Sequence, residues 1–271
     1  MVTNPGFFTD TTLCIGCKAC EVACKEWNQL PGNAPQFLDS FDNTGQLDAQ
    51  NWRHVKFIER TDASPSKPVA WHMMSDVCKH CEQASCLEVC PTNAIIRTEF
   101  NTVYIQQDVC NGCRDCIAAC PYDVIGFSKE TGTVHKCTFC YDRLQNNLTP
   151  ACAKVCPTEA IKFGELSDLR KVAADRVGQL HTQGHPEAQV YGDKEYGGLH
   201  AFFLLMDEPE VYGLPNTQSA VLPTRNNAPG YLGMAITAVA AVLGGLVALR
   251  RRGSYASSGA DAETGAGEGK I

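Results

Sequence analysis

Sixteen cysteines in four regularly spaced groups constrain this chain more than any other feature of its sequence. The first and third groups share the spacing C-x2-C-x2-C-x3-C, the second lengthens the middle gap to four residues, and the fourth lengthens it to eleven. Proline follows the last cysteine of three groups, at Pro91, Pro121 and Pro157. The four groups, which account for all sixteen cysteines, are Cys14, Cys17, Cys20 and Cys24; Cys78, Cys81, Cys86 and Cys90; Cys110, Cys113, Cys116 and Cys120; and Cys137, Cys140, Cys152 and Cys156.

This spacing indicates [4Fe-4S] clusters. The tight loop places three thiolates around one cluster, and the fourth cysteine, turned away by the proline, reaches a neighbouring cluster. At four thiolates per cluster, the cysteines predict four [4Fe-4S] clusters in two pairs that exchange their last ligands. Disulfides are disfavoured, because 271 residues far exceed the length of small disulfide-rich secreted domains. Tetrahedral zinc is the alternative, since C-x2-C pairs also bind zinc, although zinc does not need the full run with its proline.

Short hairpins near the cysteine groups predict an α+β fold. Residues 94–98 and 103–106 form one expected hairpin, and residues 124–128 and 133–136 form another. The sequence PTNAI after Cys90 is nearly repeated as PTEAI after Cys156, which indicates an internal repeat. We expect short helices to follow the cysteine loops and the clusters to replace much of the hydrophobic core that such small units lack.

The segments between and after the cysteine groups are interpreted as support. Residues 54–58 are expected to form a strand within an insert that serves packing and partner contact. Residues 167–180 form an amphipathic pattern with Ser167 as the expected N-cap, and residues 199–206 form a nearly continuous apolar run. We expect this helix and this strand to brace the cluster domains.

The C-terminal region predicts a membrane anchor. Residues 207–230 contain four prolines and are expected to form a semi-rigid linker. The 19 uncharged residues from Tyr231 to Leu249 would extend roughly 28 Å as a helix, about the thickness of the hydrocarbon core. Three arginines follow at 250–252, so the positive-inside rule places the C-terminus in the cytoplasm and the cluster domains outside. A buried soluble helix is the alternative.

Composition and motifs exclude other classes of function. The net charge of −7 argues against a nucleic-acid-binding surface. The sequence contains neither an H-E-x-x-H motif nor a phosphate-binding G-x-x-x-x-G-K-[ST] loop, so we expect the chain to be non-catalytic by itself. The opening residues show no basic and apolar signal segment, so we expect export of the folded subunit together with a partner that carries the signal. The alternative keeps the cluster domains in the cytoplasm and treats the three arginines as misleading.

Several sequences between and around the cysteines resemble the iron-sulfur (beta) subunit of membrane-bound respiratory formate dehydrogenase. The resemblance extends from about residue 7 to residue 252, including the anchor. It is carried by GFFTD at 6–10, CIGCKACEVAC at 14–24, EWN at 26–28, KCTFCYDR at 136–143, PACAKVCPT at 150–158 and GGLH at 197–200.

The resemblance implies two ferredoxin-like halves related by a pseudo-twofold axis, with the first cysteine group paired with the fourth and the second with the third. The half built from the first and fourth groups would face a molybdenum or tungsten catalytic subunit, and the other half a membrane cytochrome b that reduces quinone. The implied cluster ligands are Cys14, Cys17, Cys20 and Cys156; Cys137, Cys140, Cys152 and Cys24; Cys78, Cys81, Cys86 and Cys120; and Cys110, Cys113, Cys116 and Cys90.

The expected organisation follows from these observations together. Residues 1–30 and 135–166 would form the first half, residues 31–74 the insert and residues 75–134 the second half. The remaining parts would be a bracing helix and strand at 167–206, a linker at 207–230, a single transmembrane helix at 231–249, and a basic stop with a disordered tail at 250–271.

We therefore expect an electron-transfer subunit at the cell membrane, with its cluster domains on the periplasmic side. Four cations lie beside or between the ligands, where solvated side chains are the usual outcome and raised cluster potentials the alternative: Lys18, Lys79, Arg114 and Lys136. His80 is expected to donate a hydrogen bond to a cluster sulfide. Two alternatives stay open: the same relay in a hydrogenase or in a polysulfide or sulfoxide reductase, and a zinc-stabilised membrane scaffold without a redox role.

Overall fold

The computed structural model describes residues 2–32, 41–42, 44–61, 70–215 and 228–260. The chain divides into two compact units, Met1–Ala220 and Val221–Ile271, and the first contains every cysteine. The helices of the first unit are α1 (Ala19–Asn28), α2 (Ser85–Glu88), α3 (Asp115–Ala119), α4 (Tyr141–Gln145), α5 (Ala151–Val155) and α6 (Leu166–Thr182), with short 3-10 helices η1 (Glu195–Gly197) and η2 (Pro209–Tyr212). Its strands are β1 (Pro5–Asp10), β2 (Arg53–Arg60), β3 (Ala70–Val77), β4 (Ile95–Arg97), β5 (Val103–Ile105), β6 (Gly126–Phe127), β7 (Val134–His135), β8 (Ile161–Glu165), β9 (Gln189–Tyr191) and β10 (Ala201–Leu205).

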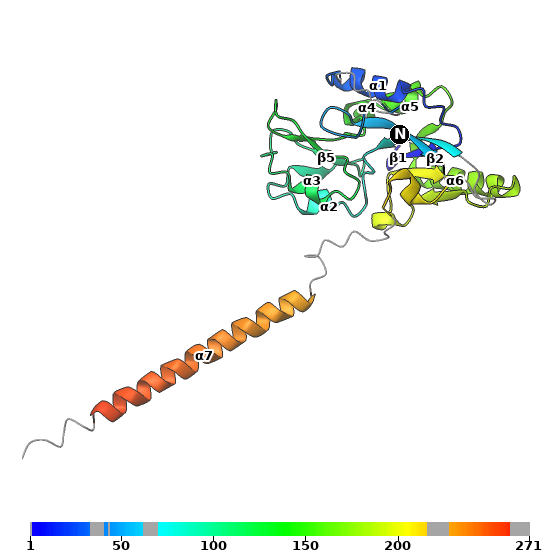
Figure 1. Cartoon of the computed structure of the whole chain (residues 1–271). Coiled ribbons are helices and arrows are strands. Elements are labelled where there is room, and N and C mark those ends of the chain that lie inside the picture. Colours follow the sequence, from blue (N-terminus) through cyan, green and yellow to red (C-terminus); the bar gives the residue numbers. More distant parts are fainter. Residues whose placement is uncertain (1, 33–40, 43, 62–69, 216–227, 261–271) are drawn as a thin grey trace, which may run out of the picture. The chain divides into compact units, whose positions relative to one another are not determined.

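A four-stranded sheet in the order β8-β1-β10-β9 separates two hydrophobic cores. Figure 1 labels its strand β1 and the helix α6 of the same unit. Successive side chains of a strand point to opposite faces of its sheet, and in β1 both faces are buried. Phe7 stacks on Phe139 at 4.2 Å between ring centroids, in the core that contains the cysteines. Phe8 stacks on Phe202 at 5.3 Å, in the core beneath α6. One face of the sheet therefore packs against the cysteine region, and α6 covers the opposite face of the sheet.

Helix α6 confirms the helix expected over residues 167–180 but begins differently. Its buried side chains are Leu166, Leu169, Ala173 and Leu180. The expected N-cap at Ser167 is wrong, because β8 ends at Glu165 and continues directly into the helix, which leaves Ser167 inside the first turn. The N–H of Leu166 instead donates to the carbonyl of Asn4, 2.9 Å away, so the segment preceding β1 satisfies part of the helix start.

Three antiparallel hairpins complete the first unit. The expected hairpins near residues 94–106 and 124–136 are present as β4-β5 and β6-β7. The strand expected at 54–58 is part of β2, which pairs with β3 along its whole length. The strand expected at 199–206 is β10, and all of its side chains are buried. These local elements surround the cysteine loops.

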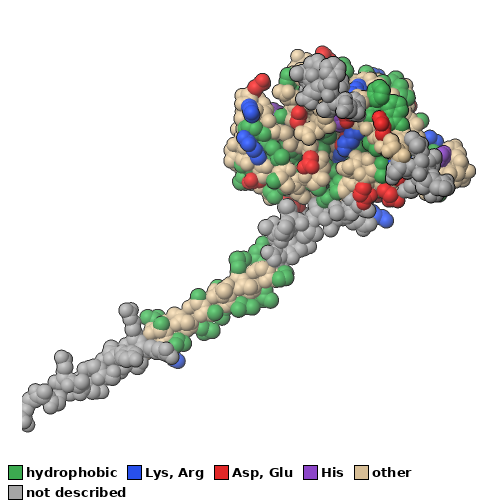
Figure 2. Space-filling view, in the orientation of Figure 1, with side chains coloured by type: hydrophobic (Ala, Val, Ile, Leu, Met, Phe, Trp, Pro, Cys, Tyr) green, Lys and Arg blue, Asp and Glu red, His purple; other side chains and the backbone are tan. Residues whose placement is uncertain are grey.

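The second unit contains one described helix, α7 (Ala228–Ala260). Residues Pro229–Arg250 are long and apolar enough to cross a membrane, with a mean hydropathy of 2.3. Figure 2 shows hydrophobic side chains along this helix. The helix continues to Ala260, so residues 253–260 are helical, where a disordered tail was expected; residues 261–271 lie outside the described residues.

The expected linker at 207–230 also differs at both of its ends. Asp207, Pro209, Tyr212 and Leu214 are buried in the first unit, because η2 packs its apolar side chains into the core beneath α6. At the other end, α7 already begins at Ala228. Residues 216–227 lie outside the described residues.

Candidate metal centres

Two of the cysteine loops have the same backbone conformation. Gly16 and Gly112 have φ angles of 65° and 69°, and Lys18 and Arg114 have φ angles of 59° and 72°. Glycine adopts such left-handed angles without strain. Alternation of left- and right-handed residues turns successive backbone N–H groups toward one side, which forms an anion-binding concavity that also occurs at iron-sulfur sites. The loops are therefore shaped to receive a negatively charged group.

The cysteine side chains gather into four sets, each drawn from two groups. Three small spaces are each lined by four cysteines. In each, three cysteines come from one group, and the fourth is the last cysteine of another: Cys137, Cys140 and Cys152 with Cys24; Cys110, Cys113 and Cys116 with Cys90; and Cys14, Cys17 and Cys20 with Cys156. The remaining four, Cys78, Cys81, Cys86 and Cys120, are electrostatic neighbours of one another around Cys81.

These donors fit a bound metal cluster. Burial raises the pKa of Cys20, Cys86 and Cys137 to about 12 in each case. Buried thiols of this kind become thiolates when they bind metal, and thiolate sulfur is the donor that iron-sulfur clusters require. Backbone groups support the charged form, since the N–H of Phe139 donates to Cys137 Sγ at 3.3 Å.

Charge interactions between cysteines link each set to another set. After burial itself, Cys152 contributes to the raised pKa of Cys20, and Cys78 contributes to that of Cys137. Cys116 contributes in the same way to the raised pKa of Cys86. Each of these pairs joins two different sets. The set of Cys20 is linked to the set of Cys152, the set of Cys152 to that of Cys78, and the set of Cys78 to that of Cys116.

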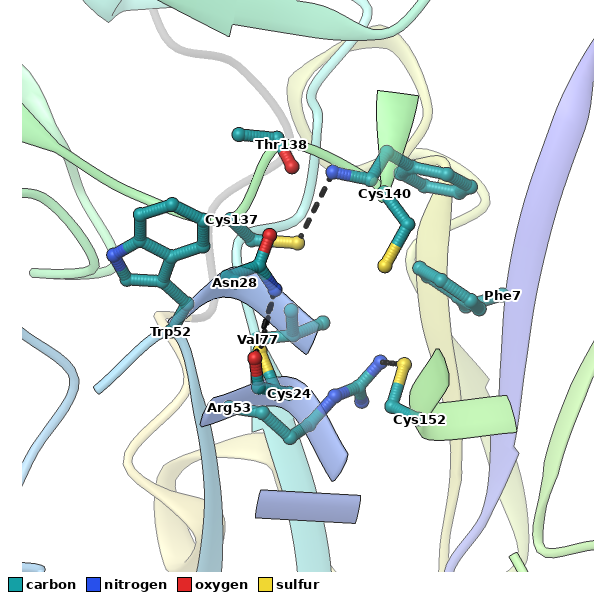
Figure 3. A pocket seen from close by; sticks show the side chains of 11 residues that line it. Phe7, Cys24, Asn28, Trp52, Arg53, Val77, Cys137, Thr138, Cys140 and Cys152 are labelled. Carbon is teal, nitrogen blue, oxygen red and sulfur yellow. Dashed lines mark hydrogen bonds between the residues drawn. The ribbon is translucent and has the colours of Figure 1, made fainter. Parts of the chain in front are cut away.

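Arg53 enters this region, although its position in the sequence does not suggest it. It begins β2, and Figure 3 shows its guanidinium beside the space lined by Cys24, Cys137, Cys140 and Cys152. Its Nη2 donates to Cys152 Sγ at 3.1 Å. Burial lowers the pKa of Arg53, but the neighbouring thiols, Cys152 foremost, outweigh burial and raise it overall. This cation is therefore held inside the cysteine region.

The four expected cations divide into two buried and two outer residues. Lys79 is paired with Asp76, and Lys136 donates to the carbonyls of Val103 and Cys137. Both lysines are at most 2% exposed. Lys18 instead donates to the carbonyl of Phe41 at 2.7 Å, in an exposed contact. Arg114 is exposed and lies over the ring of Phe127, 3.9 Å from its centroid. Only the two lysines thus combine proximity to ligands with burial.

His80 has the hydrogen-bonding pattern expected of a donor to a cluster. Its Nδ1 accepts the backbone N–H of Val103 at 3.1 Å, and its Nε2 is buried without a hydrogen-bond partner in the described residues. Burial, together with Lys136, lowers the pKa of His80 well below its ordinary value, so the ring is neutral. With Nδ1 as acceptor, the proton is assigned to Nε2.

Sequence comparisons identify the family of these sites. Models of the 4Fe-4S dicluster domain match residues 13–94 and 69–166. The chain is 40% identical over 210 residues to the nitrate-inducible formate dehydrogenase iron-sulfur subunit of Escherichia coli, covering 76% of this chain and 70% of the relative. It is 39% identical to the formate dehydrogenase iron-sulfur subunit of Haemophilus influenzae, covering 76% and 67%. This protein belongs to the family of formate dehydrogenase iron-sulfur subunits.

Membership in this family of iron-sulfur subunits decides between the two metal interpretations. The dicluster matches and the sixteen cysteines support four [4Fe-4S] clusters rather than zinc. The protein is also 35% identical to a subunit of the anaerobic dimethyl sulfoxide reductase of E. coli, over 65% of its own length and 80% of that relative. It is thus an electron-transfer subunit of the iron-sulfur type.

Proposed function

We propose that this subunit conducts electrons from a molybdenum or tungsten formate dehydrogenase catalytic subunit, through four [4Fe-4S] clusters, to a membrane cytochrome b and quinone. The observation that carries the proposal is the row of four cysteine sets, each linked to the next by charge interactions between cysteines. When bound, the clusters accept and release single electrons. The protein holds them apart, excludes water and directs hydrogen bonds to sulfur, which together set their potentials.

Each cysteine set is proposed to hold one cluster, with ligands exchanged between groups. Contacts between the short helices support this pairing: α1, from the first group, packs on α5, from the fourth, and α2 packs on α3. The proposed ligands are Cys14, Cys17, Cys20 and Cys156 for the first cluster; Cys137, Cys140, Cys152 and Cys24 for the second; Cys78, Cys81, Cys86 and Cys120 for the third; and Cys110, Cys113, Cys116 and Cys90 for the fourth.

We further propose two ferredoxin-like halves related by a pseudo-twofold axis, residues 1–30 with 135–166 and residues 75–134. Repeated backbone angles support this organisation. Asn93, Asp123 and Glu159 each lie three residues after the last cysteine of a group, and each has a left-handed φ, of 54°, 50° and 53°. Such a conformation is uncommon outside glycine, so its recurrence at equivalent positions favours a duplicated unit.

Electrons would enter at the first cluster and leave at the fourth. Cys17 and Cys113 are the two exposed cysteines of the chain, and they belong to these two end sets. Apolar side chains are exposed beside them, with Ile15 60% and Val109 40% accessible. Such positions suit contact with partner proteins. By family resemblance, the end with Cys17 would face the catalytic subunit and the end with Cys113 the cytochrome b.

The second unit is proposed to anchor the subunit by a single membrane pass. The apolar helix segment Pro229–Arg250 supports a span, and the three arginines at 250–252 favour a cytoplasmic C-terminus. The cluster domains would then lie on the periplasmic side. The similarity to the dimethyl sulfoxide reductase subunit keeps one second candidate, the same relay in a sulfoxide reductase.

Anaerobic purification from detergent-solubilised membranes tests this function. The expected preparation contains a partner with molybdenum or tungsten and a b-type haem protein, and formate reduces its clusters, whereas dimethyl sulfoxide does not reoxidise them. A preparation whose clusters formate leaves oxidised, but which dimethyl sulfoxide reoxidises after dithionite reduction, would support the second candidate instead.

A further inference from the structure

We infer that Arg53 is a positioning residue that joins the first two clusters through hydrogen bonds and raises the reduction potential of both. The inference rests on the proposed function, because it requires clusters in the sets of Cys20 and Cys152. Arg53 belongs to the insert, outside all four cysteine groups.

A continuous line of contacts runs from one cysteine set to the next through Arg53. Nη2 of Arg53 donates to Cys152 Sγ at 3.1 Å. Nη1 lies 3.3 Å from the hydroxyl oxygen of Ser75 and 3.3 Å from its carbonyl oxygen. The same hydroxyl lies 3.2 Å from Cys20 Sγ. The two end sulfurs of this line belong to neighbouring proposed clusters.

The register of one hairpin builds this line. Arg53 begins β2 and pairs with Val77 of β3, while Val55 pairs with Ser75. Arg53 and Ser75 therefore occupy adjacent strands near the same end of the hairpin. Both are almost fully buried, at 2% and 1% exposure, so water does not screen the guanidinium charge. The Phe7 ring covers the guanidinium, 5.1 Å from the ring centroid.

The charge of Arg53 is directed at sulfur rather than at a carboxylate. In the described part of the chain, its hydrogen-bond acceptors are Ser75 and Cys152. Its Nε is also buried without a hydrogen-bond partner among those residues, which leaves one donor beside the Cys152 set. Lys79 differs, because Asp76 pairs with it and offsets its charge.

These contacts have a defined electrochemical effect. Reduction of a bound cluster by one electron adds one negative charge and changes no bond and no proton. A fixed positive charge and a hydrogen bond to sulfur both stabilise this more negative state, so they raise the potential. Because the line reaches both Cys152 and Cys20, the first two clusters both respond. An electron that arrives from the donor protein is thus held more favourably at this end of the row.

The test measures cluster potentials in the anaerobically purified membrane complex by redox titration with paramagnetic resonance. In Arg53→Gln we expect full iron content and lower potentials for two of the four clusters. The expected size is about tenfold in the ratio of reduced to oxidised cluster at a fixed potential, or about 59 mV for one electron. Arg53→Lys, which keeps the charge, should restore part of the shift. Arg170→Gln, which removes a half-buried cation of α6 paired with Asp193, should change none.

Outcomes of this test separate the inference from the proposed function. Arg53→Gln with full iron and four unchanged potentials would overturn the inference, while wild-type protein without four cluster signals would overturn the proposed function. If Arg53→Gln loses iron, Ser75→Ala decides, because it removes the hydroxyl between Cys20 and Arg53 and leaves the charge in place. We expect this variant to lower the potential of one cluster, so that its ratio of reduced to oxidised form at a fixed potential falls about threefold. An unchanged potential would contradict the inference.

Discussion

At the scale of single residues, the last cysteine of each group determines how the groups are connected. Cys156 directly follows α5, whose Cys152 belongs to a different set. The three residues between them separate two sulfurs that face different spaces. One short helix and the residue directly after it therefore supply ligands to two proposed clusters.

Replacing Cys156 by serine tests this exchange. Cys156→Ser should damage the cluster held by the first cysteine group, because its sulfur lines the same space as Cys14, Cys17 and Cys20. Cys152→Ser is the matched variant on the same helix and should damage the second cluster instead. Paramagnetic resonance with iron analysis of each variant distinguishes the two signals. Loss of the same signal in both variants would show that the ligands are not exchanged.

Functional residues could be predicted from the sequence where they lie next to the cysteines, and could not where the chain brings them in from a distance. Spacing alone indicated the cysteines, and adjacency indicated Lys79 and Lys136, which are buried. Adjacency also placed Arg114 beside the fourth cysteine set, but this side chain is exposed and lies over the ring of Phe127. Arg53 could not be found in this way, since 99 residues separate it from Cys152 and only the tertiary fold brings the start of β2 next to α5.

At the scale of elements, the segment that precedes β2 packs tightly against strand β6. Gly126 of β6 lies so close to the backbone of Asp48 and Ala49 that an added Cβ would be 2.0 Å from the Ala49 nitrogen. The atoms that an added Cβ would meet belong to the backbone, so no flexible side chain could move aside to make room. The absence of a side chain at Gly126 therefore allows the hairpin β6-β7 to approach the segment that precedes β2.

Gly126→Ala should accordingly destabilise the first unit by about 1–3 kcal/mol, the usual cost of overpacking. Gly178→Ala is the control, because an added Cβ in α6 meets nothing within 4 Å and alanine favours helix, so stability should rise by about 0.5–1 kcal/mol. Thermal unfolding of both variants, followed by circular dichroism with the clusters bound, measures the difference. Equal midpoints for the two variants would contradict the close approach at Gly126.

Element prediction from sequence succeeded where pairing is local. The hairpins β4-β5 and β6-β7 join strands separated by a few residues, and turn and strand preferences sufficed to place them. The four-stranded sheet was not predicted, because its central pairing joins Phe7 to Ala201 across nearly the whole first unit. Nothing in the local pattern of β1 specifies a partner so distant in sequence.

At the scale of the whole molecule, the cysteine unit and the apolar helix are separate. The first unit, Met1–Ala220, contains its own cores and all sixteen cysteines. A chain that ends at Ala220 should therefore retain full iron but fractionate away from membranes. Full-length Val239→Arg is the matched variant, since a charge near the middle of the span disfavours insertion by about 2.5–3.5 kcal/mol. Iron analysis of soluble and membrane fractions checks this; loss of iron on truncation would show that the units depend on one another.

Iron stoichiometry of the anaerobically purified full-length protein is the most direct measurement of the central claim. Sixteen cysteines at four per cluster predict sixteen irons per chain, no zinc, and four signals that each appear on one-electron reduction. Colourless protein, or protein with far fewer irons and stoichiometric zinc, would contradict the four-cluster relay.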